Sequence, residues 1–498
     1  MTAQSQTSGG QSQSSGEGHP AEPLLSSYGP GRFYCELLEA CRDKAPAAQE
    51  LLRRLNAFSI EELVERAAAA ERELMMLGVT FTVYSQRNRI DRTLPFDVIP
   101  RVLSGDEWST LERGVIQRVN AINLFLADIY GPQKVLADGI LPKELVLGNE
   151  NYRPIMRDIK VPHGTYVVIN GTDLVRGGDG KFRVLEDNCR TPSGVSYVVE
   201  NRHLIQRAFP DLVDALPIRP VSDYGQQLAR ALREMAPAGV GSPRIALLSP
   251  GTYNSAYFEH VFLAREAGIT LVEGQDLVVE DDRVYMRTID GLQEVHVIYR
   301  RIDDAFLDPE VFREDSMLGV PGLVRALAKG RVTLANAIGT GVADDKAVYA
   351  YMPRIIRYYL DEEPIIDNVQ TNICAEKEGL AYTLDHLSEL VVKPVGESGG
   401  YGIVIGPHAS QEELEDIRAK LKAAPHKFIS QPMIELSVSP TLVEGEIGAR
   451  HVDLRPFVIT GAKPWVLPGG LTRVALRKGS LVVNSSQGGG SKDTWVLG

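Results

Sequence analysis

The stretch "VVKPVGESGGYGIVI" (residues 391–405) restricts the possible folds of this chain more than any other. A β-branched run lies on each side, which predicts two strands, and four of the seven residues 396–402 are glycine. A simple hairpin turn needs only two to five residues, and glycine has little preference for a fixed conformation. Walker and Rossmann loops lead from a strand into a helix, whereas a strand follows this loop. The pattern predicts a strand–loop–strand flap that closes over a nucleotide.

Such a flap would hold phosphate oxygens through its backbone. Where no Cβ blocks the approach, backbone N–H groups can reach these oxygens closely. Lys393, at the end of the first strand, would place a positive charge beside the α- or β-phosphate. A flexible surface hairpin without a ligand is the alternative interpretation. The contacts expected from the flap are Gly396, Ser398, Gly399, Gly400, Tyr401 and Gly402.

A second pattern, "TDLVRGGDGKFRVLEDN" (172–188), predicts a β-hairpin with polar side chains on one face. Glu186 and Asn188 are two residues apart on one strand and so face the same side, and Asp173 lies on the preceding strand. Two carboxylates and an amide oxygen are hard ligands of the kind that Mg²⁺ takes together with substrate phosphates. Polar strand faces are common, so this pattern alone is a weak indication of a Mg²⁺ site. The predicted phosphate flap in the same chain strengthens it.

Composition excludes several classes of protein. The 498 residues are 44% hydrophobic and 24% charged, which is typical of a globular protein of several domains. A net charge of −12 argues against binding to nucleic acid, and no apolar run is long enough to cross a membrane. The N-terminus has no secretory pattern, and four cysteines without metal spacing suggest reduced thiols in a cytoplasmic protein. Residues 1–28, rich in Ser, Gln and Gly, are expected to be a disordered tail.

Mixed helix and strand patterns divide the rest of the chain into four regions. "RIALLSPG", "SAYFEHVFLAREAG" and "ITLVEG" predict a βαβ unit. Residues 29–100 are predicted to be an N-terminal helical region, 101–240 the part with the metal ligands, 241–340 the α/β domain with the βαβ unit, and 341–498 the nucleotide-binding part with the flap.

From about residue 30 to 498 the chain resembles the circularly permuted ATP-grasp family of bacterial proteins, whose substrate is uncharacterised. ATP-grasp proteins have two lysines, a glycine flap and a late Asp…Glu-x-Asn magnesium triad; here the triad comes first, so the order is permuted. The resemblance rests on "DIYGPQKVLADG", "VLEDNCRTPSGVSYVVENR", "PGTYNSAYFEH", "VIYRRIDDAFLDP", "GTGVADDKAVYAYMP", "VVKPVGESGGYG", "HVDLRPFV", "PGGLTRVA" and "VNSSQGGGSKDTWVL". It implies a mixed α/β, circularly permuted ATP-grasp fold with a Rossmann-like βαβ domain.

The resemblance also implies roles for individual residues. Lys346 would be the first nucleotide lysine, and a more distant similarity to glutathionylspermidine synthetase points to a missing charge. That family has an arginine two residues before the metal aspartate, where this chain has Gly171, so we expect Arg455 or Arg473 to supply it. The adenine hinge would be Gln431, Pro432, Met433 and Ile434, and further phosphate or substrate contacts would be Asn484, Gln487 and Lys492.

The substrate is expected between the βαβ unit and the metal-binding strands, at the carboxyl end of a strand. The predicted substrate contacts are Arg190, Ser193, Gly194, Tyr253, Asn254, Ser255, Arg300 and Asp303. Cys189, next to the metal ligands, is interpreted as a packed thiol, because no histidine is near it in the sequence.

These assignments imply an ATP- and Mg²⁺-dependent ligase that joins a carboxylate to an amine through an acylphosphate. Two alternatives stay open: a degenerate ATP-binding scaffold, which Gly171 favours, and a phosphotransferase with a stable phosphorylated product. The expected partners are a small-molecule or peptide carboxylate and an amine, and a homo-oligomer is compatible with the sequence. The sequence does not identify either substrate.

Overall fold

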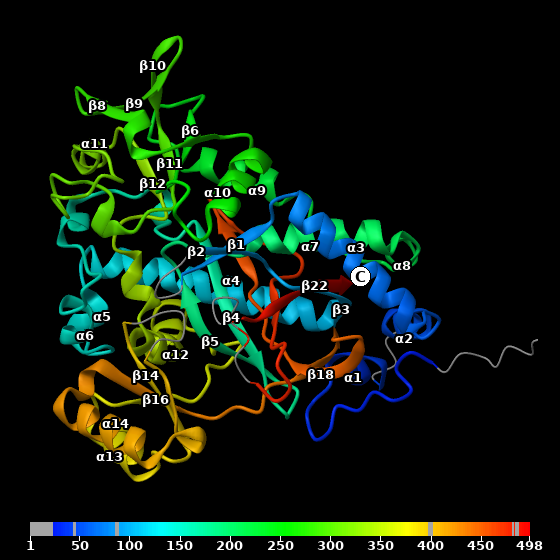
Figure 1. Cartoon of the computed structure of the whole chain (residues 1–498). Helices are drawn as coiled ribbons and strands as arrows, with labels where there is room; N and C mark the ends of the chain where they lie inside the picture. Colours follow the sequence, from blue (N-terminus) through cyan, green and yellow to red (C-terminus); the bar gives the residue numbers. More distant parts are fainter. Residues whose placement is uncertain (1–22, 43–45, 85–88, 397–401, 481–482, 484–487) are drawn as a thin grey trace, which may run out of the picture.

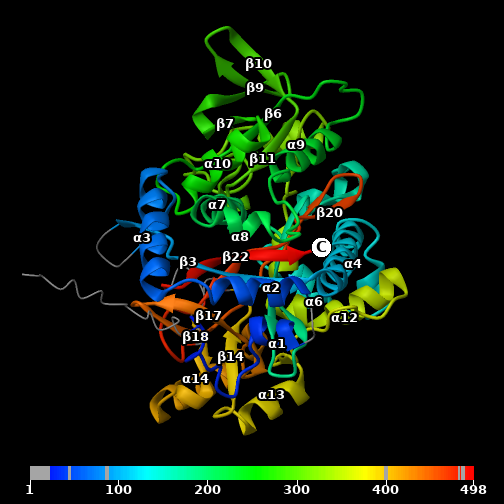
Figure 2. The same ribbon diagram turned by 90° about the vertical axis from the view of Figure 1, so that its right-hand side faces the viewer.

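The computed structural model describes residues 23–42, 46–84, 89–396, 402–480, 483 and 488–498. Its centre is the long helix α4 (Gly105–Ile129), whose N-cap Ser104 forms a reciprocal capping box with Glu107. In Figures 1 and 2 a parallel sheet lies at one end of the molecule and a small lobe with α13 and α14 at the other. The strands that carry the predicted metal ligands lie between them.

The predicted metal-binding hairpin is β4 (Ile169–Arg176) and β5 (Phe182–Asn188), and these two strands pair antiparallel. They belong to a four-stranded sheet of order β20-β19-β4-β5, which also contains β19 (Phe457–Thr460) and β20 (Pro464–Val466). Phe457 stands opposite Gly171 in this sheet. Strand pairing therefore brings the last part of the chain directly beside the metal-binding hairpin.

A second sheet joins the two ends of the described chain. Strand β22 (Gly490–Leu497) lies between β21 (Thr472–Val474) and β3 (Phe96–Ser104), antiparallel to the first and parallel to the second. Trp495 and Leu497 of β22 are buried in the same apolar cluster as Val98 and Val102 of β3. The C-terminal strand is thus an integral part of the N-terminal region (Figure 2).

The βαβ prediction is confirmed by a four-stranded parallel sheet of order β12-β11-β6-β7. Helix α10 (Tyr257–Ala267) joins β6 (Ile245–Leu248) to β7 (Thr270–Val272), and β11 (Val297–Arg300) and β12 (Thr333–Ala335) continue the sheet. An antiparallel arm of β8 (Leu277–Glu280), β9 (Arg283–Thr288) and β10 (Gly291–Val295) extends from it, at the top of Figure 1. Helix α9 (Tyr224–Glu234) packs against α10, and α11 (Leu323–Ala328) against β9. Helix α7 (Val195–Ala208) packs instead against β22 and is followed by α8 (Pro210–Asp214).

The flap strands lie in the small lobe. Strand β14 (Leu390–Pro394) pairs with β15 (Val404–Ile405) and with β16 (Phe428–Pro432), in a sheet completed by β13 (Asn372–Ile373). Helices α13 (Lys377–Asp385) and α14 (Gln411–Ala423) belong to this lobe, and a capping box of Ser410 and Glu413 begins α14. Helix α12 (Lys346–Leu360) packs against α4, and short helices α5 (Lys134–Ala137) and α6 (Lys143–Leu147) lie beside it.

The N-terminal region contains more than the helices that the sequence predicted for residues 29–100. Beside α1 (Glu36–Arg42), α2 (Pro46–Leu55) and α3 (Ile60–Met76) it has the hairpin of β1 (Thr80–Tyr84) and β2 (Arg89–Thr93), and strand β3. The buried Glu36 accepts hydrogen bonds from Arg101 (2.7 Å), Arg176 (2.9 Å) and Ser437 (2.5 Å). These bonds join α1 to β3, to the metal-binding hairpin and to the segment before the hairpin of β17 (Val438–Val443) and β18 (Glu446–His451).

The tail prediction is wrong at its C-terminal boundary. Residues 1–22 lie outside the described part of the chain, but Leu24, Leu25 and Tyr28 pack against the N-terminal apolar cluster. The backbone N–H of Leu25 also donates to Asn56 Oδ1 (2.9 Å). Two neighbouring leucines at the end of a polar segment were the sequence signal for this anchor. Among the described helices, none is both long enough and apolar enough to cross a membrane.

This boundary predicts different results for two N-terminal truncations. A chain that begins at Pro23 is expected to unfold like the full chain, because the removed residues have no apolar anchor in their composition. A chain that begins at Gly29 also loses Leu24, Leu25 and Tyr28, and we expect it to lose roughly 2 kcal/mol of unfolding free energy. Urea unfolding of the three chains measures the difference. Equal stability of both truncated chains would contradict the packing of residues 23–28.

Candidate functional site

The predicted metal ligands meet on the paired strands β4 and β5. Asp173 stands directly opposite Glu186, and Asn188 follows on the same face two residues later. Asp173 is 1% exposed, whereas the side chain of Glu186 keeps 31% of its exposure and so faces an opening. Asn188 donates through Nδ2 to the Gly171 carbonyl (3.1 Å). The strand pairing therefore places two carboxylates and an amide oxygen together, as the sequence predicted.

Two arginines from the C-terminal part of the chain bind Asp173. Arg455 donates through Nε to Oδ1 and through Nη2 to Oδ2 (2.8 Å), and Arg473 donates through Nη2 to Oδ2 (2.7 Å). Burial alone would raise the pKa of Asp173, but the two guanidinium groups hold it well below its usual range. The neighbouring Asp453 binds Arg473 through both carboxylate oxygens (3.0 Å each to Nε). The sequence did not indicate Asp453, because its role depends on its ion pair with Arg473, which is 20 residues later in the chain.

The side chain of Arg455 occupies the space beside Gly171. A Cβ atom on Gly171 would lie 3.2 Å from Arg455 Cδ, 3.4 Å from its Cγ and 3.2 Å from Pro192 Cβ. Arg455 Nη2 is also 3.9 Å from Glu186 Oε1. Arg455 thus reaches the metal-binding hairpin at the position where an arginine at residue 171 would begin.

The two predicted nucleotide lysines approach the same hairpin from the other side. Lys346 is the first residue of α12, and its backbone N–H donates to the carbonyl of Val395 (3.3 Å), directly before Gly396. Lys393 on β14 donates through Nζ to Gln431 Oε1 (2.6 Å). Burial lowers the pKa of Lys393 to about 8, with Lys346 acting in the same direction and Glu186 opposing it. The charges of the two lysines and Glu186 therefore interact in one site.

A pocket connects these groups. It is lined by Glu186 and Asn188 of the hairpin, by Lys346 of α12 and by Gly396 at the base of the flap. Its remaining lining residues are Asn151, Asp187, Arg190, Gly341, Asp344, Asp345 and Val395. The pocket thus contains residues from the predicted metal-binding hairpin, from the first turn of α12 and from the base of the predicted flap.

The donor set is suited to Mg²⁺ in company with phosphate. Within the described ranges no three or more His, Cys, Asp and Glu side chains are grouped to hold a metal. Magnesium needs no such cage, because it takes one or two carboxylates, waters and substrate phosphates. Burial and the adjacent Asp173 raise the pKa of Glu186, so a cation beside the two carboxylates would favour the ionised pair. Asp173 would share its oxygens between that cation and the two arginines.

The sequence profile of the family described as "Circularly permuted ATP-grasp type 2" matches residues 100–475. The match spans the metal-binding hairpin, both lysines and both arginines. The chain belongs to this family. The ATP-grasp resemblance and the mixed α/β, circularly permuted ATP-grasp fold are thereby confirmed.

Three similar proteins extend this finding. The chain is 52% identical over 474 residues to an uncharacterised protein of Synechocystis sp., across 95% of this chain and 98% of that protein. It is 42% identical over 479 residues to a Frankia casuarinae protein named "Putative glutamate–cysteine ligase 2-2", across 96% of this chain but 55% of the Frankia protein. The solved structure of a glutathione synthetase-like effector from Globodera pallida in its apo form gives a TM-score of 0.56 at 10% identity, across 88% of this chain and 98% of that one. The structural likeness concerns the fold alone.

Several predicted contacts fall outside the described part of this ATP-grasp chain or beside its edge. The flap residues Ser398, Gly399, Gly400 and Tyr401 and the C-terminal Asn484 and Gln487 lie outside the described residues. Gly402, the last of the expected flap contacts, has φ +72°, a backbone conformation that favours glycine. At the predicted hinge, Gln431 is buried and donates to Thr371 Oγ1 (2.9 Å), while Pro432, Met433 and Ile434 continue from the end of β16.

The prediction for Lys492 is wrong. The side chain is 1% exposed, and Nζ donates to Asp97 Oδ2, to the Ile99 carbonyl (2.9 Å) and to the Pro440 carbonyl (2.8 Å), so all three ammonium hydrogens have acceptors. Its strand partner is Thr472, the residue before Arg473. Since neighbouring strand residues point to opposite faces, Lys492 faces the N-terminal core, whereas Arg473 faces the site.

The prediction for Arg300 is also wrong. Its guanidinium is fully buried and donates to the carbonyls of Asn336 (2.9 Å), Ile302 (2.7 Å) and Ala337 (2.9 Å). An ion pair with Asp304 (2.7 Å) completes its contacts. Arg300 stabilises the edge of the parallel sheet, and its complete burial keeps it from contact with a substrate.

Other predicted substrate residues are brought to one edge of the site. Arg190 donates to Asp344 (2.7 Å) and Asp303 (3.1 Å), and so connects the metal-binding hairpin, the loop before Lys346 and the parallel sheet. Gly194, with φ +110°, begins α7, and a Cβ there would lie 2.7 Å from Leu471 Cδ2. The loop residue Tyr253 is 79% exposed. Its neighbours Asn254 and Ser255, in the loop before α10, are partly buried, and so is Ser193.

Two buried residues missed or underused by the sequence analysis hold this edge. Arg301 donates to the Pro192 carbonyl (2.6 Å), Ser193 Oγ (2.6 Å) and Glu259 Oε1 (3.0 Å). Glu259 Oε2 accepts from the backbone N–H of Gly194 (2.6 Å) and so caps α7. In the sequence, only their positions could have indicated this role: Arg301 directly follows β11, and Glu259 lies on the helix after β6. Cys189 is fully buried, and burial raises the pKa of its thiol well above the usual value, which agrees with a packed thiol.

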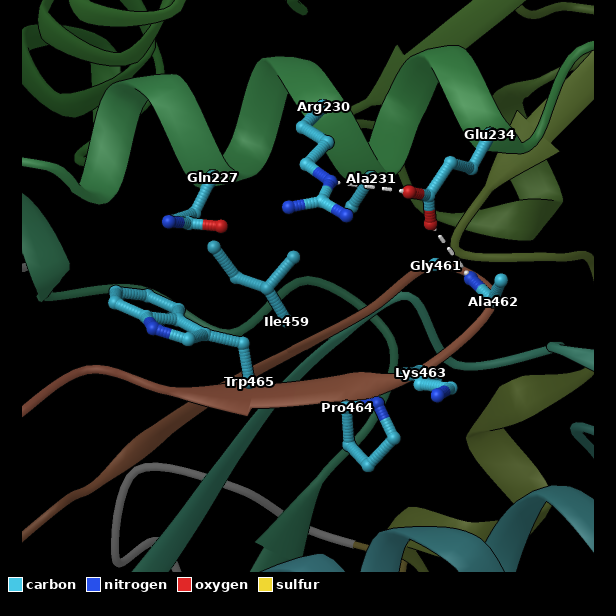
Figure 3. A pocket seen from close by; sticks show the side chains of 10 residues that line it. All are labelled: Gln227, Arg230, Ala231, Glu234, Ile459, Gly461, Ala462, Lys463, Pro464 and Trp465. Atoms are coloured by element: carbon cyan, nitrogen blue, oxygen red, sulfur yellow. Dashed lines mark hydrogen bonds and ion pairs between the residues drawn. The ribbon is translucent and has the colours of Figure 1, made fainter.

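A separate pocket of about 410 Å³ lies between α9 and the β19–β20 hairpin (Figure 3). Glu234 on α9 accepts from Arg230 Nε (3.2 Å) and from the backbone N–H of Ala462 (2.8 Å), so polar groups of the two walls pair with each other. It contains none of the residues predicted from the sequence, and it shares no lining residue with the pocket beside Glu186.

The position of Arg455 predicts a rescue experiment. Arg455→Gly is expected to weaken Mg²⁺–ATP binding roughly 10- to 100-fold, because a charged hydrogen-bond donor is lost. Adding Gly171→Arg should restore part of the affinity, since the space beside residue 171 is then free except for Pro192. Calorimetric titration measures all forms. Gly171→Arg alone is the control and should bind poorly, because two side chains compete for one space. A double variant no better than Arg455→Gly would contradict this assignment.

The lowered pKa of Lys393 predicts a pH dependence of ATP binding. Below pH 8 the amine of the free protein carries a charge, and above pH 8 it becomes increasingly neutral. Bound phosphates favour the charged form, so ATP affinity should be highest below pH 8 and fall by up to about tenfold per pH unit above it. Lys393→Arg, which stays charged, should remove the fall between pH 7 and 9. The same slope in both proteins would exclude Lys393 as its source.

Proposed function

We propose that this protein is an ATP-dependent carboxylate–amine ligase that works through an acylphosphate and forms a peptide-like amide bond. The observation that supports this most is the convergence of Asp173, Glu186 and Asn188 with two lysines and two arginines in one site. A site with many positive groups around a pair of carboxylates is suited to phosphoryl transfer, in which catalysis is mostly positioning and charge neutralisation.

In the first step, an oxygen of the substrate carboxylate forms a bond to the γ-phosphorus of ATP, and the bond from that phosphorus to the β–γ bridging oxygen breaks, which releases ADP. In the second step, the lone pair of the amine attacks the acyl carbon, inorganic phosphate leaves, and the amine loses a proton. Magnesium held by Asp173, Glu186 and Asn188 would neutralise charge on the transferred phosphoryl group.

The chain's own residues have separate tasks in this scheme. Lys346 and Lys393 would bind the phosphates of ATP, and Arg455 and Arg473, which reach Asp173, would offset the charge of the transferred phosphoryl group. A ligase of this type needs no side-chain nucleophile, and the fully buried Cys189 offers none. The predicted flap would exclude water that hydrolyses an acylphosphate.

The named relative supports an amide-forming reaction but not particular substrates. The Frankia casuarinae protein carries the name of a glutamate–cysteine ligase, and this chain matches 55% of its length. The name can therefore belong to the remainder of that protein. For this chain we propose amino-acid or peptide-like substrates, one with a free carboxylate and one with an amine, and no nucleic acid. Gly171 had favoured a degenerate scaffold, but Arg455 now fills the adjoining space with a positive charge.

The proposal is tested by incubating small-molecule cell extract with the protein, Mg²⁺ and ATP, followed by mass spectrometry. We expect a new product whose mass is the sum of a carboxylate and an amine minus water, together with ADP and phosphate. Glu186→Ala should lose this product while it keeps the fold, because 31% of the Glu186 side chain is exposed. A phosphorylated product would favour a phosphotransferase, and no change in the extract would favour a scaffold.

A further inference from the structure

Behind the metal-binding strand lies a buried arginine that the proposed reaction does not use. Arg118, on α4, is 2% exposed and faces Asp187, the residue between the metal ligands Glu186 and Asn188. Its Nε lies 2.8 and 2.9 Å from the two carboxylate oxygens of Asp187, and Nη2 lies 2.7 Å from Oδ2. Because strand side chains alternate, this pair fixes the back of the same strand whose front carries the ligands.

The same guanidinium has a second arm that leads to a nucleotide lysine. Arg118 Nη1 donates to Asn368 Oδ1 (2.8 Å), and Asn368 Nδ2 donates to the Tyr349 carbonyl (2.7 Å). Tyr349 lies one turn after Lys346 on α12, and its hydroxyl donates to the Val184 carbonyl of β5 (2.6 Å). Arg118 therefore contacts the metal-binding strand directly and the first turn of α12 through one residue.

The three elements meet in the middle of the molecule, although they are far apart in the sequence (Figure 1). Asp187 is 69 residues from Arg118, and Asn368 is 250 residues from it. Arg118 also lies over the ring of Tyr349, 5.5 Å from its centroid, which adds a cation–π contact. In the described structure, the forked guanidinium of Arg118 is the shared partner of Asp187 and Asn368.

We propose that Arg118 is a positioning residue, which holds the metal-binding strand and the helix of Lys346 in one fixed geometry and so couples metal binding to nucleotide binding. This inference rests on the proposed function, because it assumes that both arms serve ATP. A planar guanidinium donates in several fixed directions at once, whereas a lysine ammonium is a compact point charge. Asp187 and Asn368 therefore require an arginine for geometry rather than for charge alone.

The experiment measures ATP affinity by calorimetry, once with Mg²⁺ and once with EDTA, and takes the ratio of the two as the magnesium effect. In Arg118→Lys the buried charge stays but the fork is lost. We expect its magnesium effect to fall roughly tenfold or more, in the range for loss of a partner behind a metal ligand, and its affinity in EDTA to fall too. In Asn368→Ala only the arm to α12 is cut, so ATP affinity should fall in both conditions, and the magnesium effect should fall as well because the connection between the two arms is broken.

Arg202 provides a matched control. It is equally buried, and it donates to Asp493 Oδ2 (2.7 Å) and to the carbonyls of Arg219 (3.0 Å) and Thr494 (2.8 Å), none of which lines the site. Arg202→Lys loses a similar fork elsewhere, and thermal unfolding shows how much stability each change removes. We expect Arg202→Lys to lower the melting temperature like Arg118→Lys while both ATP affinities stay at the wild-type value.

The outcomes separate this inference from the function on which it rests. A wild-type protein that binds ATP without any magnesium effect would overturn the proposed function, and this inference with it. The wild type can show the expected magnesium effect while Arg118→Lys and Arg202→Lys have the same ATP affinities in both conditions. That result would overturn the positioning role alone. If Arg118→Lys does not fold, Asn368→Ala decides, because Asn368 is only partly buried. An unchanged magnesium effect in that variant would then reject the coupling.

Discussion

The buried carboxylate of Asp173 needs compensation, and this need connects the two halves of the molecule. An isolated buried charge is costly, and removal of one partner from a buried ion pair destabilises by about 3–5 kcal/mol. Asp173 finds its partners in Arg455 and Arg473, which are 282 and 300 residues later in the chain. The segment with Arg455, directly before β19, and strand β21 must therefore come close to β4 before this charge is neutralised. Charge compensation thus favours the same arrangement that strand pairing builds, and the resulting cluster is also the phosphate-facing side of the proposed active site.

Patterns with a local cause were predictable from the sequence. The period of two in a strand placed Glu186 and Asn188 on one face, and the Gly-rich turn brought Asp173 opposite them. Likewise, the βαβ unit and the Ser410 capping box follow from residues that are neighbours in the chain. The family resemblance then added what local patterns lack, namely which lysines and arginines belong with that hairpin.

The failures concern long-range contacts. Lys492 and Arg300 follow motif-like glycines or strand ends, as real ligands do, but their environment decides their roles. Lys492 meets Asp97, which is 395 residues away, and Arg300 meets the carbonyls of a loop 36 and 37 residues later. No local pattern distinguishes a charged side chain that faces a site from one whose donors are all used in the core. The packed residues Leu24 and Leu25 at the end of the predicted tail were missed for the same reason.

The contacts of Arg455 extend the proposed active-site cluster to the parallel sheet. Its Nη1 donates to the Ser193 carbonyl (3.2 Å), and Arg301, after strand β11, binds Ser193 Oγ and the Pro192 carbonyl. Glu259 of α10 holds both Arg301 and the backbone of Gly194. The segment from Pro192 to Gly194 thus lies between the arginine nearest the metal ligands and the sheet whose carboxyl edge carries Tyr253 and Asn254. A ligand at that edge would contact the same short segment that orients Arg455. The proposed substrate edge and the proposed metal site are therefore connected through a few buried hydrogen bonds.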